Sequence, residues 1–149
     1  MKRFLSFTIL VLAAGFLTTS FKTGRSSGIV DDVLTYTNEF RASRGLKALT
    51  PNEALNRIAQ KHSENMASGK VKFGHDGFSK RNAAAQKQLS IHYFAENVAY
   101  GVPTGQEAVN LWKNSEGHRA NMLGKYAQIG IGVAKDKQGR IFYTQVFSD

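Results

Sequence analysis

Apolar residues at helical spacing mark the chain from residue 30 onward. Over 30–44 they recur every three or four positions, which predicts a helix with one buried face. These positions are Val30, Val33, Leu34, Thr37 and Phe40. Gly45 follows, and glycine is favoured just past a helix C-terminus, so we expect the helix to end there.

A second amphipathic helix is expected after Thr50. Thr50, Pro51 and Glu53 fit a capping box, with Thr50 as N-cap and Pro51 at the first helical position. The apolar stripe that follows is Leu55, Ile58, Ala59, His62 and Met66. Because His62 lies on this stripe, we assign it a packing role, and we expect the helix to end at Ser68 and Gly69.

Two further helices are predicted in the middle of the chain. The stretch 79–88 is rich in alanine and reads as a weaker helix. Thr104 and Glu107 form a second capping box, which opens a helix that runs toward Ser115. Trp112 lies on a face of that helix, and we expect it to anchor the core against a sheet.

The remaining segments carry the pattern of strands. The segment 95–100 is short and rich in apolar residues, and 129–134 alternates Ile and Val with Gly. After a turn at 136–139, residues 141–147 form a strong β segment. In the last strand, alternate residues should face the helices and the solvent. Helices followed by a closing hairpin predict a mixed α+β domain with helices packed on an antiparallel sheet.

The first residues have the composition of a secretory signal. Lys2 and Arg3 precede an apolar run over 4–17 that is too short for a membrane-spanning helix. We therefore expect a signal peptide over 1–20, a flexible polar tether over 21–29 and one domain over 30–149. The mature protein should be periplasmic or extracellular, with no membrane span.

Composition narrows the possible functions. The chain of 149 residues has no cysteine, which excludes thiol nucleophiles, thiol redox chemistry and cysteine-bound zinc. Its formal net charge of +9 would draw it to anionic surfaces, although scattered basic residues are also typical of a solvated surface. Export argues against nucleic acid as the partner.

Two imidazoles and two carboxylates are the candidate chemical groups: His75, Glu96, Glu116 and His118. Neutral imidazoles bind Zn²⁺, and a carboxylate can act as a third ligand or as a general base. Without metal, each Glu could hydrogen-bond an imidazolium and fix it. Glu116 and His118 are separated by Gly117, and in extended backbone their side chains would point to the same side.

Other polar residues have simpler interpretations. Asn97 and Asn121 lie in turn-rich contexts and should tie loops through backbone hydrogen bonds. Ser115 precedes Glu116, but no Gly-x-Ser-x-Gly elbow surrounds it, which argues against a serine hydrolase. Nothing in the sequence requires a chemical role for His92.

A set of ordered motifs resembles one family. The motifs are Asn38-Glu-Phe-Arg-Ala42 with Gly45-Leu46 and Leu49, then Glu96-Asn97-Val98, then Gly117-His118-Arg119-x-Asn121-Met122-Leu123, then Tyr143-Thr144-Gln145-Val146-Phe147. Together they resemble the CAP superfamily of cysteine-rich secretory, antigen 5 and pathogenesis-related 1 proteins. The chain has no cysteine and therefore no disulfide, and in this it resembles the compact bacterial branch of that superfamily.

The resemblance implies an α-β-α sandwich with a central antiparallel sheet. It also implies that His75, Glu96, Glu116 and His118 form a tetrad that lines one cleft. Members of the family are mostly binders, so we expect a module that captures a lipid, a glycan, a peptide or a partner protein. A divalent metal such as Zn²⁺ could bind at His75 and His118. The alternative is a metal-dependent, protease-like hydrolase with Glu96 or Glu116 as general base.

Overall fold

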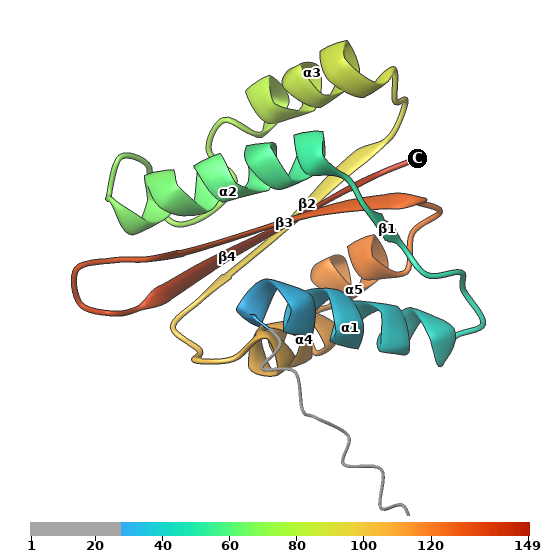
Figure 1. Ribbon diagram of the computed structural model, residues 1–149, viewed down its shortest axis with the longest axis horizontal. Coiled ribbons are helices and arrows are strands. Elements are labelled where there is room, and N and C mark those ends of the chain that lie inside the picture. Colours follow the sequence, from blue (N-terminus) through green and yellow to red (C-terminus); the bar gives the residue numbers. More distant parts are fainter. Residues whose placement is uncertain (1–27) are drawn as a thin grey trace, which may run out of the picture.

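A computed structural model describes residues 28–149, so the predicted signal peptide and nearly all of the tether lie outside the described residues. Helices cover both faces of one sheet, with α2 and α3 on one side and α1, α4 and α5 on the other (Figure 1). The elements are α1 Ile29–Ala42, β1 Thr50–Pro51, α2 Glu53–Ala67, α3 Phe78–Leu89, β2 Phe94–Tyr100, α4 Gly105–Lys113, α5 Glu116–Met122, β3 Gln128–Lys135 and β4 Ile141–Ser148. This confirms the predicted α-β-α sandwich.

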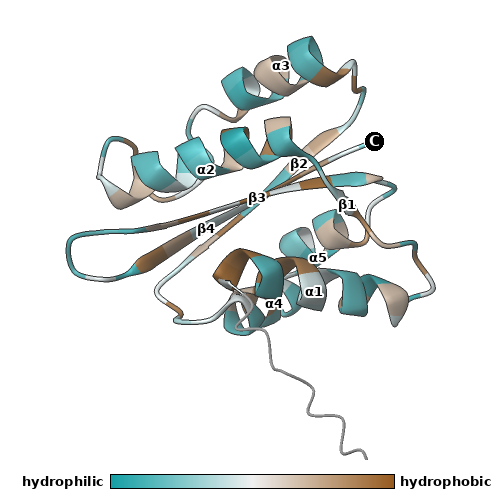
Figure 2. Ribbon diagram, in the orientation of Figure 1, coloured by the Kyte–Doolittle hydropathy of each residue, from teal (hydrophilic) through white to brown (hydrophobic). Residues whose placement is uncertain are grey.

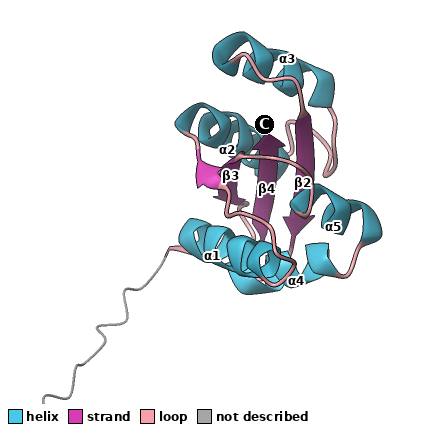
Figure 3. Cartoon of the chain, turned by 90° about the vertical axis from the view of Figure 1, so that its right-hand side faces the viewer, coloured by secondary structure: helices cyan, strands magenta, loops and turns pink. Residues whose placement is uncertain are grey.

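The sheet has four strands in the order β1-β3-β4-β2. β3, β4 and β2 are antiparallel neighbours, whereas the short β1 pairs with β3 in parallel. β2 is therefore an edge strand, and α3 and α5 lie at the same edge (Figure 3). In the β2–β4 register, Glu96 lies opposite Val146 and Asn97 lies opposite Gln145.

Both faces of β4 are covered. All eight residues of β4 are buried, so the expectation that alternate residues face solvent is wrong. Thr144 faces α2, where its Oγ1 lies 2.8 Å from the Oγ of Ser63. Gln145 faces α1 and donates Nε2–H to the Oγ1 of Thr37 at 2.7 Å. A strand sandwiched between two helical layers has no solvent side.

Two glycines of β3 let α2 lie directly on the sheet. A Cβ at Gly130 would overlap Leu55, and a Cβ at Gly132 would overlap the backbone of Ala59 and Gln60. Protein interiors are close-packed, so such an overlap could be relieved only by moving the helix. The Ile-Gly-Ile-Gly pattern of β3 thus fixes the distance between α2 and the sheet.

The helix caps agree with the sequence at α4 and differ at α2. Thr104 caps α4 by accepting a hydrogen bond from the backbone N–H of Glu107 at 3.2 Å, as predicted. In α2 the cap is Asn52, which accepts from Ala54 and Leu55. The prediction of Thr50 as N-cap is wrong, because residues 50–51 pair with β3 as a strand.

The core lies mainly between the sheet and the layer of α1, α4 and α5. Trp112 of α4 is 1% exposed and donates Nε1–H to the carbonyl of Val98 at 3.0 Å, so its predicted anchoring role is confirmed. In Figure 2, the sides of α2 and α3 that face the viewer are largely hydrophilic. Within residues 28–149, no helix combines the length and apolar character that crossing a bilayer requires.

Candidate functional site

A buried carboxylate at the edge of the sheet organises the candidate site. The side chain of Glu96 is 0% exposed. Arg81 donates Nε–H to Oε2 at 2.5 Å and Nη2–H to Oε1 at 2.7 Å, and His75 donates Nδ1–H to Oε1 at 2.9 Å. A buried charge is stable only when it is paired and hydrogen-bonded, and the planar guanidinium meets both carboxylate oxygens.

The loop between α2 and α3 brings His75 and Arg81 to Glu96. Gly74 and Gly77 have φ of 140° and 80°, values that L-residues with side chains rarely adopt. Arg81 lies in the first turns of α3 and donates Nη1–H to the carbonyl of Asp76 at 2.8 Å. Arg81 therefore holds both the loop that carries His75 and the carboxylate that orients it.

His62 joins the same cluster from α2. It is buried, as its position on the apolar stripe predicted, and its Nε2–H donates to the carbonyl of Gly74 at 2.8 Å. The same nitrogen lies 3.8 Å from Oε1 of Glu96. Burial lowers the pKa of His62, which favours a neutral imidazole. His62 thus packs in the core and also positions the backbone beside His75.

His118 approaches the same edge from the opposite layer. Burial lowers the pKa of His118, and the charge of His75 lowers it further. His118 is half-buried, and the side chain of His75 is 49% exposed, so both are open to a ligand.

Asparagine side chains fix α5, the helix that carries His118. Asn97 donates Nδ2–H to the carbonyl of His118 at 3.1 Å. Asn121 donates to the carbonyl of Glu96 at 3.2 Å and to Oδ1 of Asn97 at 2.9 Å. Both asparagines make the predicted hydrogen bonds to backbone carbonyls, but they lie in β2 and α5 and join a strand to a helix, so the prediction that they tie loops is wrong. These bonds set the position of His118 relative to β2.

Glu116 is not drawn into the cluster. Residues 116–118 begin α5, so the extended geometry expected around Gly117 is wrong. Two helical positions differ by about 200° in direction, so the side chains of Glu116 and His118 diverge. Glu116 is exposed, and its side chain makes no hydrogen bond or ion pair with any residue of 28–149. The structure joins His75 to Glu96 by a hydrogen bond, brings the backbone of His118 to β2 through Asn97, and leaves the side chain of Glu116 without a contact to either.

The fit of a metal to these residues is partial. Among residues 28–149, no group of three or more His, Asp or Glu side chains is placed to hold a metal ion. Both oxygens of Glu96 are engaged by Arg81 and His75. The free donors are Nε2 of His75 and the imidazole of His118. Glu96 accepts the other N–H of His75 and orients the ring, as carboxylates behind metal-binding histidines do.

Two residues of the cluster were missed by sequence reasoning. Arg81 was not singled out, and His62 was given a packing role alone. A usable indication existed for Arg81: a carboxylate inside an apolar strand requires a cation, and Arg provides the bidentate geometry. For His62 no local pattern separates a core histidine from one that contacts the site.

The family comparison agrees with the geometry. The model of the CAP family, described as the cysteine-rich secretory protein family, matches residues 34–147. The chain belongs to the CAP family. The match spans every helix and strand that carries the cluster, and it confirms the resemblance noted from the sequence motifs.

Curated relatives of this CAP domain occur in Bacillus subtilis. The uncharacterized membrane protein YlbC is 34% identical over 121 residues, which cover 77% of this chain and 33% of YlbC. The uncharacterized protein YkwD is 36% identical over 104 residues, which cover 67% of this chain and 40% of YkwD. The chain therefore spans less than half the length of these relatives.

Solved structures share the CAP fold. An extracellular protein with an SCP domain from Bacillus anthracis superposes with a TM-score of 0.71 at 29% identity, covering 81% of this chain and 40% of that one. A cysteine-rich secretory protein from Staphylococcus aureus gives a TM-score of 0.65 at 27% identity, covering 80% and 38%. These proteins are bacterial, as the lack of cysteine in this chain led us to expect.

Proposed function

We propose that this CAP domain is an exported binding module that captures a ligand or partner at the edge of β2, between His75 and His118. The observation that carries the proposal is the hydrogen bond between the half-exposed His75 and the buried Glu96, which holds the imidazole in one orientation. A side chain held by buried hydrogen bonds loses little conformational entropy when it binds. The cluster is therefore preorganised for recognition.

The engagement of Glu96 favours binding over hydrolysis. A general base must reach the water that it activates, and it needs a free oxygen to do so. Glu96 is sealed from solvent, and its oxygens accept hydrogen bonds from Arg81 and His75. Glu116 is exposed but makes no contact with the cluster. These arrangements support a binding role over the hydrolase alternative.

A divalent cation such as Zn²⁺ is part of the proposal. His75 and His118 would supply two nitrogens, and water or the ligand itself would complete the coordination. Two imidazoles alone make a weak site, so the metal would serve best as a bridge to a donor group on the ligand. Both histidines must be neutral to bind it, and the lowered pKa of His118 favours that form.

Exposed aromatic rings beside the loop extend the surface available to a ligand. Phe73 and Tyr100 are each 46% exposed, and their ring centroids lie 4.6 Å apart. Phe73 precedes His75 by two residues, and Tyr100 ends β2. Exposed aromatic pairs accept flat apolar groups, so lipids, glycans and peptides all remain suitable classes of ligand.

Export is proposed from two observations. The sequence of residues 1–20 has the charge and apolar pattern of a secretory signal. The structural relatives with the CAP fold are described as secretory and extracellular proteins. A periplasmic or extracellular site of action is consistent with both, and the positive net charge suits anionic surfaces there.

The proposal is tested by calorimetric zinc titration of the mature protein near neutral pH. The test variant is His75→Ala/His118→Ala, and the control is His92→Ala, which removes an exposed histidine that pairs with Asp149. We expect saturable binding in the wild type and in the control, and none in the double variant. Equal binding by the folded double variant would contradict the metal part of the proposal.

A further inference from the structure

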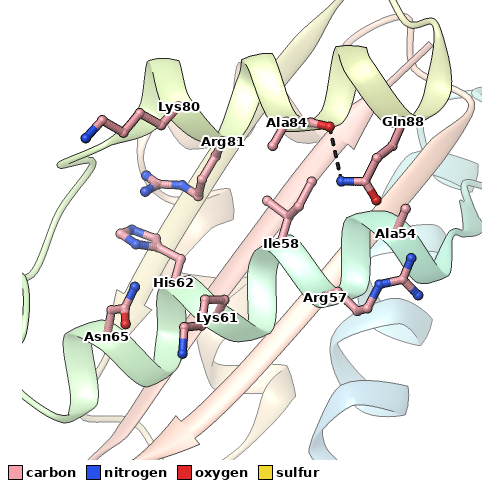
Figure 4. A pocket seen from close by; sticks show the side chains of 10 residues that line it. All are labelled: Ala54, Arg57, Ile58, Lys61, His62, Asn65, Lys80, Arg81, Ala84 and Gln88. Carbon is pink, nitrogen blue, oxygen red and sulfur yellow. Dashed lines mark hydrogen bonds between the residues drawn. The ribbon is translucent and has the colours of Figure 1, made fainter.

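A hollow lies between α2 and α3, and it shares His62 and Arg81 with the cluster around Glu96. It has a volume of about 300 Å³, at the lower end of the range for ligand pockets. Figure 4 shows the two helices running alongside each other, with the residues that line the groove on both of them. Its lining residues are Ala54, Arg57, Ile58, Lys61, His62, Asn65, Lys80, Arg81, Ala84 and Gln88.

The charge of the groove is of one sign. Four lining residues are cations and none is acidic: Arg57, Lys61, Lys80 and Arg81. Lys80 forms no ion pair with any residue of 28–149. Like charges facing one open groove repel each other, and a negative ligand relieves that repulsion.

Two of the cations have weak partners that a ligand could replace. Arg57 and Glu53 are 3.7 Å apart, and Lys61 and Glu64 are 3.9 Å apart, with at least half of every side chain exposed. Such exposed pairs contribute about 0–1 kcal/mol. Arg81 differs, because Glu96 already holds it. The charges available to a ligand are therefore Arg57, Lys61 and Lys80.

The floor of the groove is apolar at one end. Ala54 and Ile58 of α2 face Ala84 of α3, while Lys61 and Lys80 lie toward the other end (Figure 4). Asn65 lies beside this cationic end, and its side-chain amide makes no hydrogen bond to any residue of 28–149. The groove thus combines an apolar recess, a free amide and cations on both rims.

We propose that this groove binds a short acidic peptide segment that carries one aliphatic side chain. The aliphatic group would fill the recess formed by Ala54, Ile58 and Ala84. Carboxylates on either side of it would pair with Lys61, Lys80 and Arg57, and a peptide amide would bond Asn65. Several cations spread over two helices suit a ligand with several spaced negative charges, which a peptide provides.

Other occupants fit the groove less well. The first 27 residues of this chain contain Lys2, Arg3, Lys22 and Arg25 and no acidic residue, so their charge opposes binding there. An anionic membrane would meet the exposed cations but would not enter a recess between two helices. A purely charged polymer would leave the recess empty. The apolar floor therefore separates the proposed ligand from these alternatives.

Fluorescence anisotropy of labelled pentapeptides tests the proposal with the full mature chain. The probe is Glu-Glu-Leu-Glu-Glu, with Glu-Glu-Ser-Glu-Glu and Lys-Lys-Leu-Lys-Lys as matched peptides. We expect saturable binding of the leucine peptide, clearly weaker binding of the serine peptide and none of the basic peptide. Amide chemical-shift changes should gather on α2 and α3.

Variants separate the groove from general charge attraction. Lys61→Ala/Lys80→Ala should weaken binding about tenfold, since each removes one rim charge. Lys70→Ala/Lys72→Ala removes the same charge outside the groove and should leave binding unchanged. Ala84→Leu fills the recess without changing charge and should also weaken binding. Equal loss in both lysine pairs, or equal binding of the serine peptide, would overturn the proposal.

An anionic vesicle of phosphatidylglycerol supplies the last comparison. The proposal expects vesicle binding to be unaffected by Ala84→Leu, since the recess is not used by a flat membrane. Tighter binding of vesicles than of the leucine peptide, together with the same dependence on Ala84, would contradict a peptide ligand.

Discussion

Glu96 and Asn97 are neighbours on β2, and their side chains enter opposite layers of the sandwich. Glu96 meets a charged cluster of Arg81, His75 and His62 on the side of α2 and α3. Asn97 meets only neutral groups on the side of α5, namely Gln145, Asn121 and the carbonyl of His118. Both side chains are buried, and both are fully hydrogen-bonded.

The difference shows how one edge strand serves two purposes. On the charged side, the partners of Glu96 lead to the surface through the half-exposed His75. On the neutral side, the partners of Asn97 hold α5 and the backbone of His118 in place. The residue that orients His75 and the residue that positions His118 are therefore adjacent in sequence, and the pleat of the strand separates them.

The largest effect is expected where α2 meets β3. Gly132→Ala would place a Cβ against the backbone of Ala59 and Gln60, so α2 would have to move off the sheet. We expect a loss of more than about 3 kcal/mol in the free energy of unfolding, measured by urea denaturation. Gly117→Ala is the control, since its new Cβ would meet nothing within 4 Å apart from its chain neighbours and the backbone of its own helix. A small loss of stability in Gly132→Ala would mean that α2 is not packed closely against the sheet.

Removing the cation of the charged side comes next. Arg81→Met leaves the buried carboxylate of Glu96 with His75 as its close hydrogen-bond partner. We expect a loss of about 3 kcal/mol, because a buried charge that loses its counterion is strongly destabilising. Lys80→Met, one residue away and without an ion pair among residues 28–149, should change stability by less than about 0.5 kcal/mol. Equal effects would contradict the importance of the pair.

The neutral side should respond more locally. Asn97→Ala removes hydrogen bonds to Gln145, to Asn121 and to the carbonyl of His118, at a cost of about 2 kcal/mol. Hydrogen exchange should speed up in α5 while α2 keeps its protection. The same measurement on Asn82→Ala, on the far side of the sheet, should leave α5 unchanged. Uniform loss of protection would contradict a local positioning role.

The smallest effect concerns pH. The pKa values of His62 and His118 are lowered in the folded protein, in both cases mainly by burial. The unfolded chain then binds more protons near pH 6, so stability should be full above the ordinary histidine pKa of about 6.5 and decline as pH falls below it. Urea midpoints from pH 7.5 to pH 5 check this, and His118→Gln should flatten the decline.

Much of the fold could be predicted because its signals are local. The hairpin of β3 and β4 has alternating residues and a turn at Asp136, and α4 has its capping box. Elements of this kind can be predicted from the period of their apolar residues and from their capping residues. The motif residues are also explained: Asn38 bonds both backbone groups of Leu49, and Arg41 donates to the carbonyl of Met122 at 2.7 Å.

The misses depend on contacts between distant residues. The local sequence around Thr50 resembles a helix N-cap. In the structure Thr50 pairs with Gln128 of β3, and these two residues are far apart in the sequence. Residues 116–122 have weak helical character, and tertiary hydrogen bonds to Asn97 and Arg41 hold them as α5. Burial of Glu96 and its pairing with Arg81 likewise appear only once the layers are assembled.

The central proposal is that His75 and His118 line one binding site at the edge of β2. It is tested most directly by NMR titration of His118 in the wild type and in His75→Gln. The account predicts that the pKa of His118 rises in the variant, because the charge of His75 lowers it in the wild type. His92→Gln should leave it unchanged. An unchanged His118 pKa in a folded His75→Gln protein would contradict a shared cleft.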